Sequence, residues 1–367
     1  MKRFRPTYLA QTQPGFEAIA AAEIGDRLPD AIIRGTRVVA DKSGMVLFEY
    51  AGEAGDLLAL RTIEDLFVVV AALEDVPTAR EGLRLLEATA ARAPALEAAL
   101  ELARQVRPGR GGRGRLRFRV VARQVGQAAY RRVDAQRAIE RGIAARAGHR
   151  WRLVEEGGLE FWLTLLPAKA GQSEAWLALR LSDERMRHRD YQQAHLPASL
   201  RPAAAAALVW LTRPAPDDVF LDPMCGAGTI LIERAHAGRY ALLLGGDSSA
   251  EALAAARENI GPRYKPIELR EWDARKLPLD SASVTAAAVN LPFGKRVGTP
   301  EENRALYPAF LREAARVLRP GARLVALTGD ARTFEAALRR TGRLARRAVY
   351  PVRVLGQPAK VYVVERV

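Results

Sequence analysis

Cysteine is nearly absent from this chain of 367 residues, which contains only Cys225. A single cysteine excludes an internal disulfide, and four scattered histidines give no zinc-ligand spacing, so we expect no metal site. No run of about 20 apolar residues without charges occurs, so we expect no membrane contact. The start of the chain, Met1 to Pro6, is not followed by the apolar segment of a secretory signal. We therefore expect a soluble, cytoplasmic protein that acts as a monomer.

Lysine is also scarce, since seven of the 57 basic residues are lysine and the other 50 are arginine. A biased genome composition explains the preference for arginine over lysine, but it does not explain a formal net charge of +15. A polyanionic partner is the usual physical reason for such an excess of positive charge. The composition therefore favours a nucleic-acid ligand.

The basic residues are concentrated in residues 101–150, which hold 14 arginines, no lysine and three acidic residues. The alternating pattern of residues 116–122 predicts a strand, so alternate arginines in and before it project from one face. Such a row suits a phosphate backbone, although a solvated sheet face in an arginine-rich protein gives the same pattern. The candidate RNA-binding residues are Arg113, Arg115, Arg117, Arg119 and Arg123.

From residue 202 onwards, apolar strand patterns alternate with helical patterns, which predicts an α/β fold with a parallel sheet. The first strand, residues 218–222, runs into the turn Pro223-Met-Cys-Gly-Ala-Gly228. A glycine-rich turn at the carboxyl end of a strand lets a ligand approach the backbone closely. No Gly-Lys-Ser/Thr follows, and the sequence departs from Gly-x-Gly-x-x-Gly, so the turn is neither a phosphate-binding loop nor a dinucleotide fingerprint.

Three successive strands of this region end in or lead to an acid, namely Asp222, Asp247 and Asp273. S-adenosylmethionine has a cationic amino group and a sulfonium, which Asp222 can approach directly or through water. Asp247 lies 21 residues after Gly226, a separation that suits a carboxylate holding both ribose hydroxyls. Asp273 is placed to accept a hydrogen bond from the adenine amine. The alternative is that the glycines only make a tight turn and Asp247 only caps a helix.

The fourth strand, residues 284–289, is followed at once by Asn290-Leu-Pro-Phe293. The side-chain oxygen of Asn290 and a main-chain carbonyl near Leu291 can each accept one N–H of a nucleobase amine, which stabilises the charge that develops on methylation. Phe293 can stack on the base. A simple β-turn is the alternative, because asparagine, proline and glycine all favour turns. The candidate catalytic residues are Asn290, Pro292 and Phe293.

A carbon-directed reaction is excluded by the position of the cysteine. Methylation at carbon 5 of a pyrimidine uses a cysteine nucleophile. Cys225 lies inside the predicted cofactor turn, too close to the cofactor strand to act in that way.

Three segments together resemble the THUMP-domain guanine-N2 RNA methyltransferases: Asp222-Pro-Met-Cys-Gly-Ala-Gly-Thr229, Asn290-Leu-Pro-Phe-Gly294 and residues 189–202. The last of these precedes the first strand of the α/β region and is called the lead-in. Residues 118–126 and the helical pattern after them resemble the late part of a THUMP domain. The resemblance implies an N-terminal ferredoxin-like domain over residues 1–65, a THUMP RNA-binding domain over 66–181, a linker over 182–195 and a Rossmann-like class I methyltransferase domain over 196–367.

Within this family, the chain resembles the tRNA enzymes that make N2-methylguanosine at position 6 of the acceptor stem. The resemblance implies that the lead-in joins the cofactor pocket. The expected S-adenosylmethionine-binding residues are therefore His195, Leu196, Pro197, Ala198, Ser199, Asp222, Gly226, Ala227, Gly228, Thr229, Asp247, Asp273, Ala274 and Asn290.

The chain departs from the commoner amine-methyltransferase motif at one position, where Leu291 replaces the first of two prolines. That departure points away from DNA adenine enzymes. A ribosomal RNA guanine-N2 methyltransferase and a non-catalytic RNA-binding adaptor remain as alternatives to a tRNA enzyme.

Overall fold

The computed structural model describes residues 5–39, 42–107, 115–169, 171–197, 199–294 and 298–367. The chain divides into two compact units. The first unit contains residues 1–11 and 24–186, and the second contains residues 12–23 and 187–367. Within the described ranges, no helix combines the length and apolar character needed to cross a membrane.

The first unit is built on one eight-stranded sheet. Its strands are β1 (Thr7–Thr12), β2 (Ile32–Val39), β3 (Ser43–Glu49), β4 (Asp65–Pro77), β5 (Arg115–Gln124), β6 (Arg150–Leu153), β7 (Leu159–Pro167) and β8 (Gln172–Arg180). Their order in the sheet is β2-β3-β1-β4-β8-β7-β5-β6. The strand predicted over residues 116–122 is confirmed as β5, which pairs in parallel with β6 on one side and β7 on the other.

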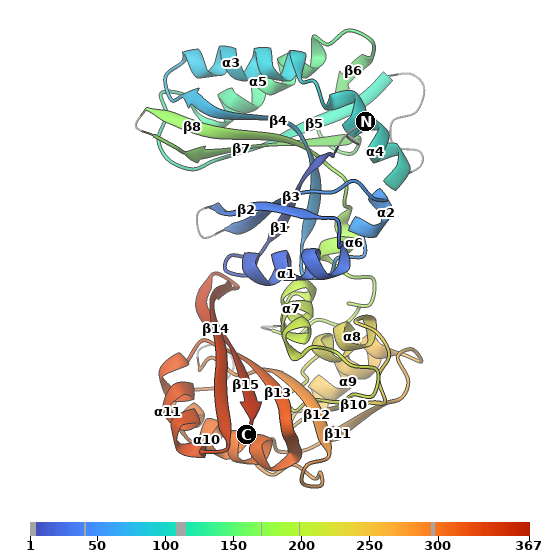
Figure 1. Ribbon diagram of the computed structural model, residues 1–367, viewed down its shortest axis with the longest axis vertical. Coiled ribbons are helices and arrows are strands. Elements are labelled where there is room, and N and C mark those ends of the chain that lie inside the picture. The colour runs from blue at the N-terminus through green and yellow to red at the C-terminus, as the bar shows by residue number, and fades with distance from the viewer. Residues whose placement is uncertain (1–4, 40–41, 108–114, 170, 198, 295–297) are drawn as a thin grey trace. The chain divides into compact units, whose positions relative to one another are not determined.

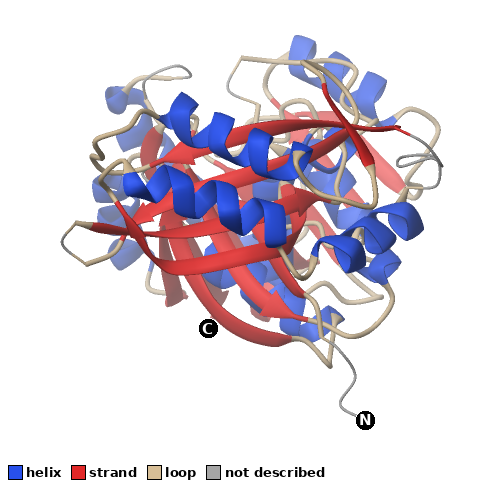
Figure 2. Cartoon of the chain, turned by 90° about the horizontal axis from the view of Figure 1, so that it is seen from above, coloured by secondary structure: helices blue, strands red, loops and turns tan. Residues whose placement is uncertain are grey.

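The first unit contains the helices α2 (Ala54–Leu57), α3 (Glu81–Arg92), α4 (Leu96–Val106) and α5 (Arg132–Ala144). The boundaries between the units fall within α1 (Glu17–Arg27), whose last residues belong to the first unit, and within α6 (Glu184–Arg187), whose last residue belongs to the second. Two helices lie side by side over the sheet in Figure 2. These are α3 and α5, and Gly142 permits their close approach, because a Cβ there would lie 2.3 Å from the carbonyl oxygen of Glu87.

The predicted boundary at residue 65 falls at the first residue of β4. Since β4 pairs with β1 on one side and with β8 on the other, one sheet runs through both predicted N-terminal domains. The division of this region into a ferredoxin-like and a THUMP domain stays a prediction.

The second unit contains a seven-stranded sheet. Its strands are β9 (Val219–Asp222), β10 (Leu242–Asp247), β11 (Ile267–Glu271), β12 (Val284–Asn290), β13 (Leu318–Thr328), β14 (Leu344–Val354) and β15 (Gln357–Arg366). Their order is β11-β10-β9-β12-β13-β15-β14. The first five strands are parallel, as the strand–helix alternation predicts, and β15 runs antiparallel to both β13 and β14.

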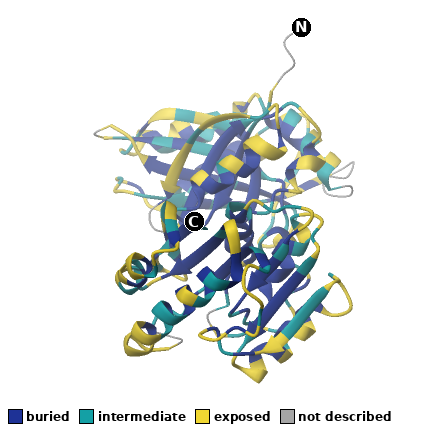
Figure 3. Cartoon of the chain, turned by 60° about the horizontal axis from the view of Figure 1, so that its bottom comes forward, coloured by how far each residue is buried: buried dark blue, intermediate teal, exposed yellow. Residues whose placement is uncertain are grey.

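Helices cover both faces of this sheet (Figure 1). They are α7 (Pro202–Thr212), α8 (Thr229–His236), α9 (Ala250–Ile260), α10 (Pro300–Val317) and α11 (Ala331–Thr341). Alternate strand residues face opposite layers: Phe220 packs with α7, α8 and α9, whereas Leu221 packs with α10 and α11. Burial on both sides explains why the strands are continuous apolar runs. Figure 3 shows the strands of the sheet as mostly buried. The predicted Rossmann-like α/β fold is confirmed.

Candidate functional site

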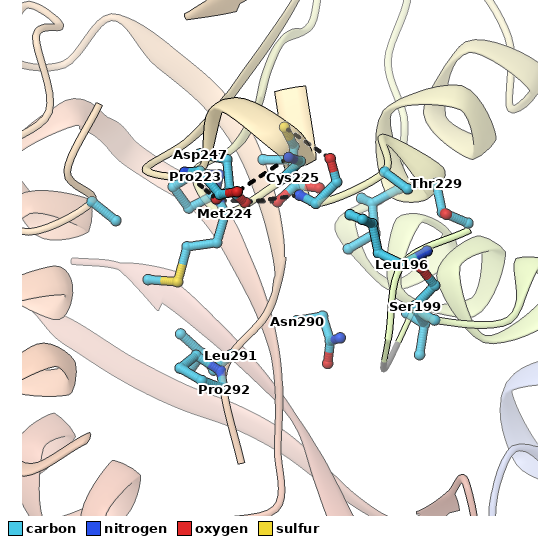
Figure 4. A pocket seen from close by; sticks show the side chains of 18 of the residues that line it. Leu196, Ser199, Pro223, Met224, Cys225, Thr229, Asp247, Asn290, Leu291 and Pro292 are labelled. Carbon is cyan, nitrogen blue, oxygen red and sulfur yellow. Dashed lines mark hydrogen bonds between the residues drawn. The ribbon is translucent and has the colours of Figure 1, made fainter. Parts of the chain in front are cut away.

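A cavity of about 570 Å³ lies at the carboxyl ends of the parallel strands, and every residue that lines it belongs to the second unit. This is where ligands bind in open α/β sheets. Its lining includes most of the predicted site: Leu196, Pro197, Ser199, Asp222, Gly226, Ala227, Thr229, Asp247, Asp273, Ala274, Asn290, Pro292 and Phe293. Figure 4 shows Asn290 between the Leu291–Pro292 segment and the pair Leu196 and Ser199.

The glycine-rich turn after β9 is fixed by the end of β10. The amide of Cys225 donates to the carbonyl of Gly246 (2.9 Å), and the amide of Gly226 donates to Oδ2 of Asp247 (3.0 Å). Gly228 caps α8 with φ +82°, and Cδ1 of Ile260 lies 3.3 Å from where its Cβ would be, so a side chain there would be strained and crowded. The turn is therefore tied to the end of β10 by two hydrogen bonds.

Asp222 is buried at the end of β9, with an exposure of 1%. Its Oδ1 accepts from the amide of Met224 at 3.4 Å, and its Oδ2 has no hydrogen-bond partner among the described residues. Burial, with the nearby charge of Asp247 adding to it, raises the pKa of Asp222 well above its usual range. A buried carboxylate without a cation is costly, so this position favours a cationic ligand.

Asp247 uses both carboxylate oxygens on backbone amides, since Oδ1 accepts from Ser249 and Oδ2 from Gly226, each at 3.0 Å. A carboxylate has about four lone-pair positions, so it can still accept from ligand hydroxyls. Asp273 is half-buried and bonded to Arg275, whose side chain lowers the pKa of that carboxyl. Trp272, the residue before Asp273, packs against Gly246 and donates from Nε1 to the carbonyl of Pro223 (3.0 Å).

The Asn290–Phe293 segment is held by buried neighbours. The amide of Leu291 donates to the carbonyl of Leu327 (2.9 Å), and the Tyr307 hydroxyl donates to the carbonyl of Pro292. The side-chain oxygen of Asn290 is buried and has no partner among the described residues. An acceptor held in a fixed frame and left without a donor is suited to receive an N–H from a ligand.

Phe293 lines the cavity beside Asn290. Its ring packs on Gly329, where an added Cβ would lie 2.5 Å from Cδ2 of the ring. The glycine therefore leaves the space that the aromatic side chain occupies.

Asn259, at the end of α9, joins residues 193–194 to the glycine-rich turn after β9. Its Oδ1 accepts from the amides of Gln193 (2.8 Å) and Ala194 (2.9 Å), and its Nδ2 donates to the carbonyls of Ala194 and Ala227 (3.0 Å each). All four bonding positions of the amide are used, and the residue is 1% exposed. Asn259 thereby sets where Leu196 and Ser199 lie relative to Ala227.

Two of the predicted cofactor residues that the structure describes, His195 and Gly228, do not line the cavity. His195 is exposed, and Gly228 acts as the helix cap described above. Ala198 lies outside the described residues. Conversely, sequence reasoning missed several lining residues, of which Trp272 carries a signal as the aromatic residue next to a strand-end acid. Val354, Leu355 and Gln357 of the β14–β15 turn also line the cavity, and no sequence pattern marks them.

The predicted RNA-binding arginines belong to the first unit and fall into two groups. Arg115 and Arg117 on β5 are exposed, whereas Arg119 pairs with Glu160. Arg123 donates to Gln11 and Ser43, and its guanidinium stacks 3.9 Å from the centre of the Trp162 ring. Arg113 lies outside the described residues.

Two further arginines extend the exposed group. The register of β5 and β6 places Arg150 beside Arg115 and Arg152 beside Arg117, and all four side chains are exposed. None of the four forms an ion pair with a carboxylate of the described residues. Like charges on facing positions destabilise a sheet, so the arrangement favours an anionic ligand.

No cluster of three or more histidine, cysteine, aspartate or glutamate side chains able to hold a metal ion occurs in the part of the chain that the structure describes. Burial raises the pKa of the Cys225 thiol, which disfavours the nucleophilic thiolate.

Two of the curated relatives that match the chain are named as tRNA guanine-N2 methyltransferases. The tRNA (guanine(6)-N(2))-methyltransferase THUMP3 of Mus musculus is 36% identical over 209 residues, which cover 53% of this chain and 41% of the relative. The tRNA (guanine(6)-N2)-methyltransferase of Thermus thermophilus is 37% identical over 157 residues, which cover 42% of this chain and 47% of the relative. The matches thus span less than half the length of these curated relatives.

The comparisons with a solved structure and with a family model extend this likeness. The crystal structure of TrmN from Thermus thermophilus has a TM-score of 0.78 and 27% identity, over 99% of this chain and 100% of that chain. The family model described as RMKL-like, methyltransferase domain matches residues 189–358. The part of the chain that lines the cavity is therefore similar to this methyltransferase domain family.

Proposed function

We propose that the protein transfers a methyl group from S-adenosylmethionine to the exocyclic N2 of a guanosine in tRNA, at position 6 of the acceptor stem, to give N2-methylguanosine. The observation that carries this proposal is the pair of buried, unpartnered oxygens in one cavity, Oδ2 of Asp222 and Oδ1 of Asn290. One suits a cationic ligand and the other an amine. The relatives' names supply the nucleotide, its position and the class of RNA.

The residues at the β9–β11 end of the cavity fit S-adenosylmethionine. Asp222 would face its cationic amino group, Asp247 its ribose hydroxyls, and the Trp272–Ala274 segment its adenine ring. The open backbone at Gly226, where a Cβ would meet nothing within 4 Å, leaves room for close approach. When bound, this cofactor supplies an electrophilic methyl group on a sulfonium.

Asn290 acts on the acceptor amine. The lone pair of a nucleobase amine is delocalised into the ring, so the nitrogen is a poor nucleophile. An N–H donated to the Asn290 oxygen favours the pyramidal nitrogen and stabilises the positive charge that develops on it. Because this bond strengthens as charge builds up, it lowers the barrier rather than only binding the substrate. The proton then leaves to solvent.

A base within a duplex must leave its stack before it reaches this cavity. That step costs a few kcal/mol. Stacking on an aromatic ring recovers roughly 1–3 kcal/mol. Phe293, held against Gly329 beside Asn290, is placed to supply that stacking.

We assign RNA contact in the first unit to the exposed arginine face, defined as Arg115, Arg117, Arg150 and Arg152. Arginine binds phosphate through two parallel N–H groups, and these side chains are not committed to protein carboxylates. We extend the proposal to a THUMP domain in this region and to a monomeric protein of the cytoplasm.

The first test is methyl transfer to unmodified tRNA followed by nucleoside mapping, with Asn290→Ala as the matched variant. We expect N2-methylguanosine at position 6 with the wild type. For Asn290→Ala we expect a loss of kcat of about 100-fold or more, the range for removing one charge-stabilising group, with little change in S-adenosylmethionine affinity. Methylation of ribosomal RNA instead of tRNA would identify the protein as a ribosomal RNA methyltransferase. RNA binding without S-adenosylmethionine binding would identify it as a non-catalytic adaptor. An equal loss of cofactor affinity would make Asn290 structural.

The raised pKa of Asp222 predicts a pH-dependent cofactor affinity. The pKa of an aspartate in the unfolded chain is about 3.9, and burial raises the pKa of Asp222 in the folded protein. Between these two pKa values the unfolded chain loses the proton first, so the folded protein becomes less stable as pH rises. A cationic ligand favours the carboxylate, so binding releases a proton and affinity rises with pH across this window. We expect calorimetry in buffers of different ionisation enthalpy to detect the released proton, and Asp222→Asn to abolish it. A flat profile with no proton release would contradict the assignment.

Asn259 predicts a selective effect on cofactor binding. Asn259→Asp keeps the acceptors for Gln193 and Ala194 but sets a carboxylate against two carbonyls. We expect S-adenosylmethionine affinity to fall about tenfold, while RNA affinity stays within about twofold. The control is Tyr191→Phe, which removes a hydrogen bond from the same lead-in to Glu233 without touching the cofactor turn. Equal losses for cofactor and RNA would reduce Asn259 to a general structural role.

The exposed arginine face predicts a change in salt dependence. Arg115→Glu with Arg117→Glu should weaken RNA binding and lower the log–log salt slope by roughly 0.7–0.9 for each phosphate that the protein no longer neutralises. The control is the pair Arg84→Glu and Arg92→Glu on α3, which makes the same charge change on a helix of the same unit. Filter binding over a salt series measures both. A slope equal to that of the control pair would refute the assignment.

A further inference from the structure

The turn between β14 and β15 breaks a strong sequence rule. Val354 pairs with Gln357, so Leu355 and Gly356 form a two-residue turn, with φ of +51° and +78°. Positive φ at both positions is the type I′ hairpin turn, whose first position strongly favours asparagine, aspartate or glycine. Leucine is disfavoured there, because its Cβ lies close to the following carbonyl oxygen.

Packing does not compensate for this conformation, since the Leu355 side chain is 39% exposed. A strained backbone position that carries an exposed apolar side chain is a reason to look for a function. Leu355 lines the same cavity as Asn290 and Phe293.

The hairpin holds its turn firmly in place. Val352 and Val354 are buried in the core beneath α7. The amide of Arg353 donates to the carbonyl of Pro14 (2.9 Å), and Gly15 fits so closely that a Cβ would lie 2.2 Å from the carbonyl oxygen of Pro351. The turn is thus a fixed part of the cavity wall.

The strand order shows which end of the cavity the turn borders. The strands that carry the expected cofactor residues, β9, β10 and β11, lie on one side of β12. β13, β15 and β14 lie on the other side, and the pairing of Lys360 with Thr328 puts the start of β15 at the carboxyl edge of the sheet. The segment that carries Asn290 therefore stands between the cofactor end and the Leu355 turn.

We propose that Leu355 is a substrate-contacting residue that packs against the nucleobase presented to Asn290 in the cavity that both residues line. This inference rests on the proposed function, because it needs a nucleobase as the acceptor. An apolar side chain packs against the face of a planar base, and the tight turn already fixes the backbone that carries Leu355, so little backbone freedom is lost on binding.

The test exploits the opposite effects expected on stability and activity. Leu355→Asn and Leu355→Gly relieve the disfavoured turn, so we expect Tm to rise by about 2–4 °C. We expect kcat/KM for unmodified tRNA at saturating S-adenosylmethionine to fall about tenfold, with the calorimetric Kd for S-adenosylmethionine unchanged. A leucine with a purely structural role would lower Tm and activity together.

The matched control is Ala282→Asn, because Ala282 is another exposed residue at positive φ (+55°) and does not line the cavity. It should raise Tm without altering kcat/KM. An unchanged kcat/KM in both Leu355 variants, or a loss confined to S-adenosylmethionine affinity, would overturn the inference. Absence of methyl transfer by the wild-type protein would instead overturn the proposed function, so the two failures are distinguishable.

Discussion

The hydrogen bonds that join the turn after β9 to the end of β10 are the constraint on which the cavity depends. Cys225 and Gly226 donate to Gly246 and Asp247, so one acid both shapes the cofactor turn and faces the cavity. Asp222, at the start of this turn, is 1% exposed, and its burial favours a cation at this position. The Asn259 amide extends the same frame to the lead-in.

The strand order gives the two ends of the cavity different chemistry. Parallel strands bring their carboxyl ends to one edge, so acids at the ends of β9 and β10 meet there. The antiparallel β15 reverses direction, so its first residues, rather than its last, reach that edge. The cofactor end is therefore acidic and built from strand ends, whereas the other end is apolar and built from a hairpin turn.

Sequence reasoning predicted the residues whose roles follow from strand periodicity alone. Asp222, Asp247 and Asn290 are recognisable because each directly ends an apolar strand, and the fold then brings the strand ends together. Asn259 and Tyr307 were missed because each acts on a backbone group distant in sequence, and an asparagine or tyrosine inside a helix has no pattern of its own. Leu355 was missed because turn rules predict asparagine or glycine at its position.

In both units, residues that break the usual rules for strand pairing or turn conformation mark candidate binding sites. On β5, Arg119 and Arg123 bond to protein side chains, whereas Arg115 and Arg117 lie beside two further arginines on β6. That repulsion costs stability, as does the left-handed conformation of Leu355. A sequence selected for stability alone would remove both costs by single substitutions. Their presence at an exposed sheet edge and at the cavity wall therefore points to ligands that offset them, an anion at the first and an apolar surface at the second.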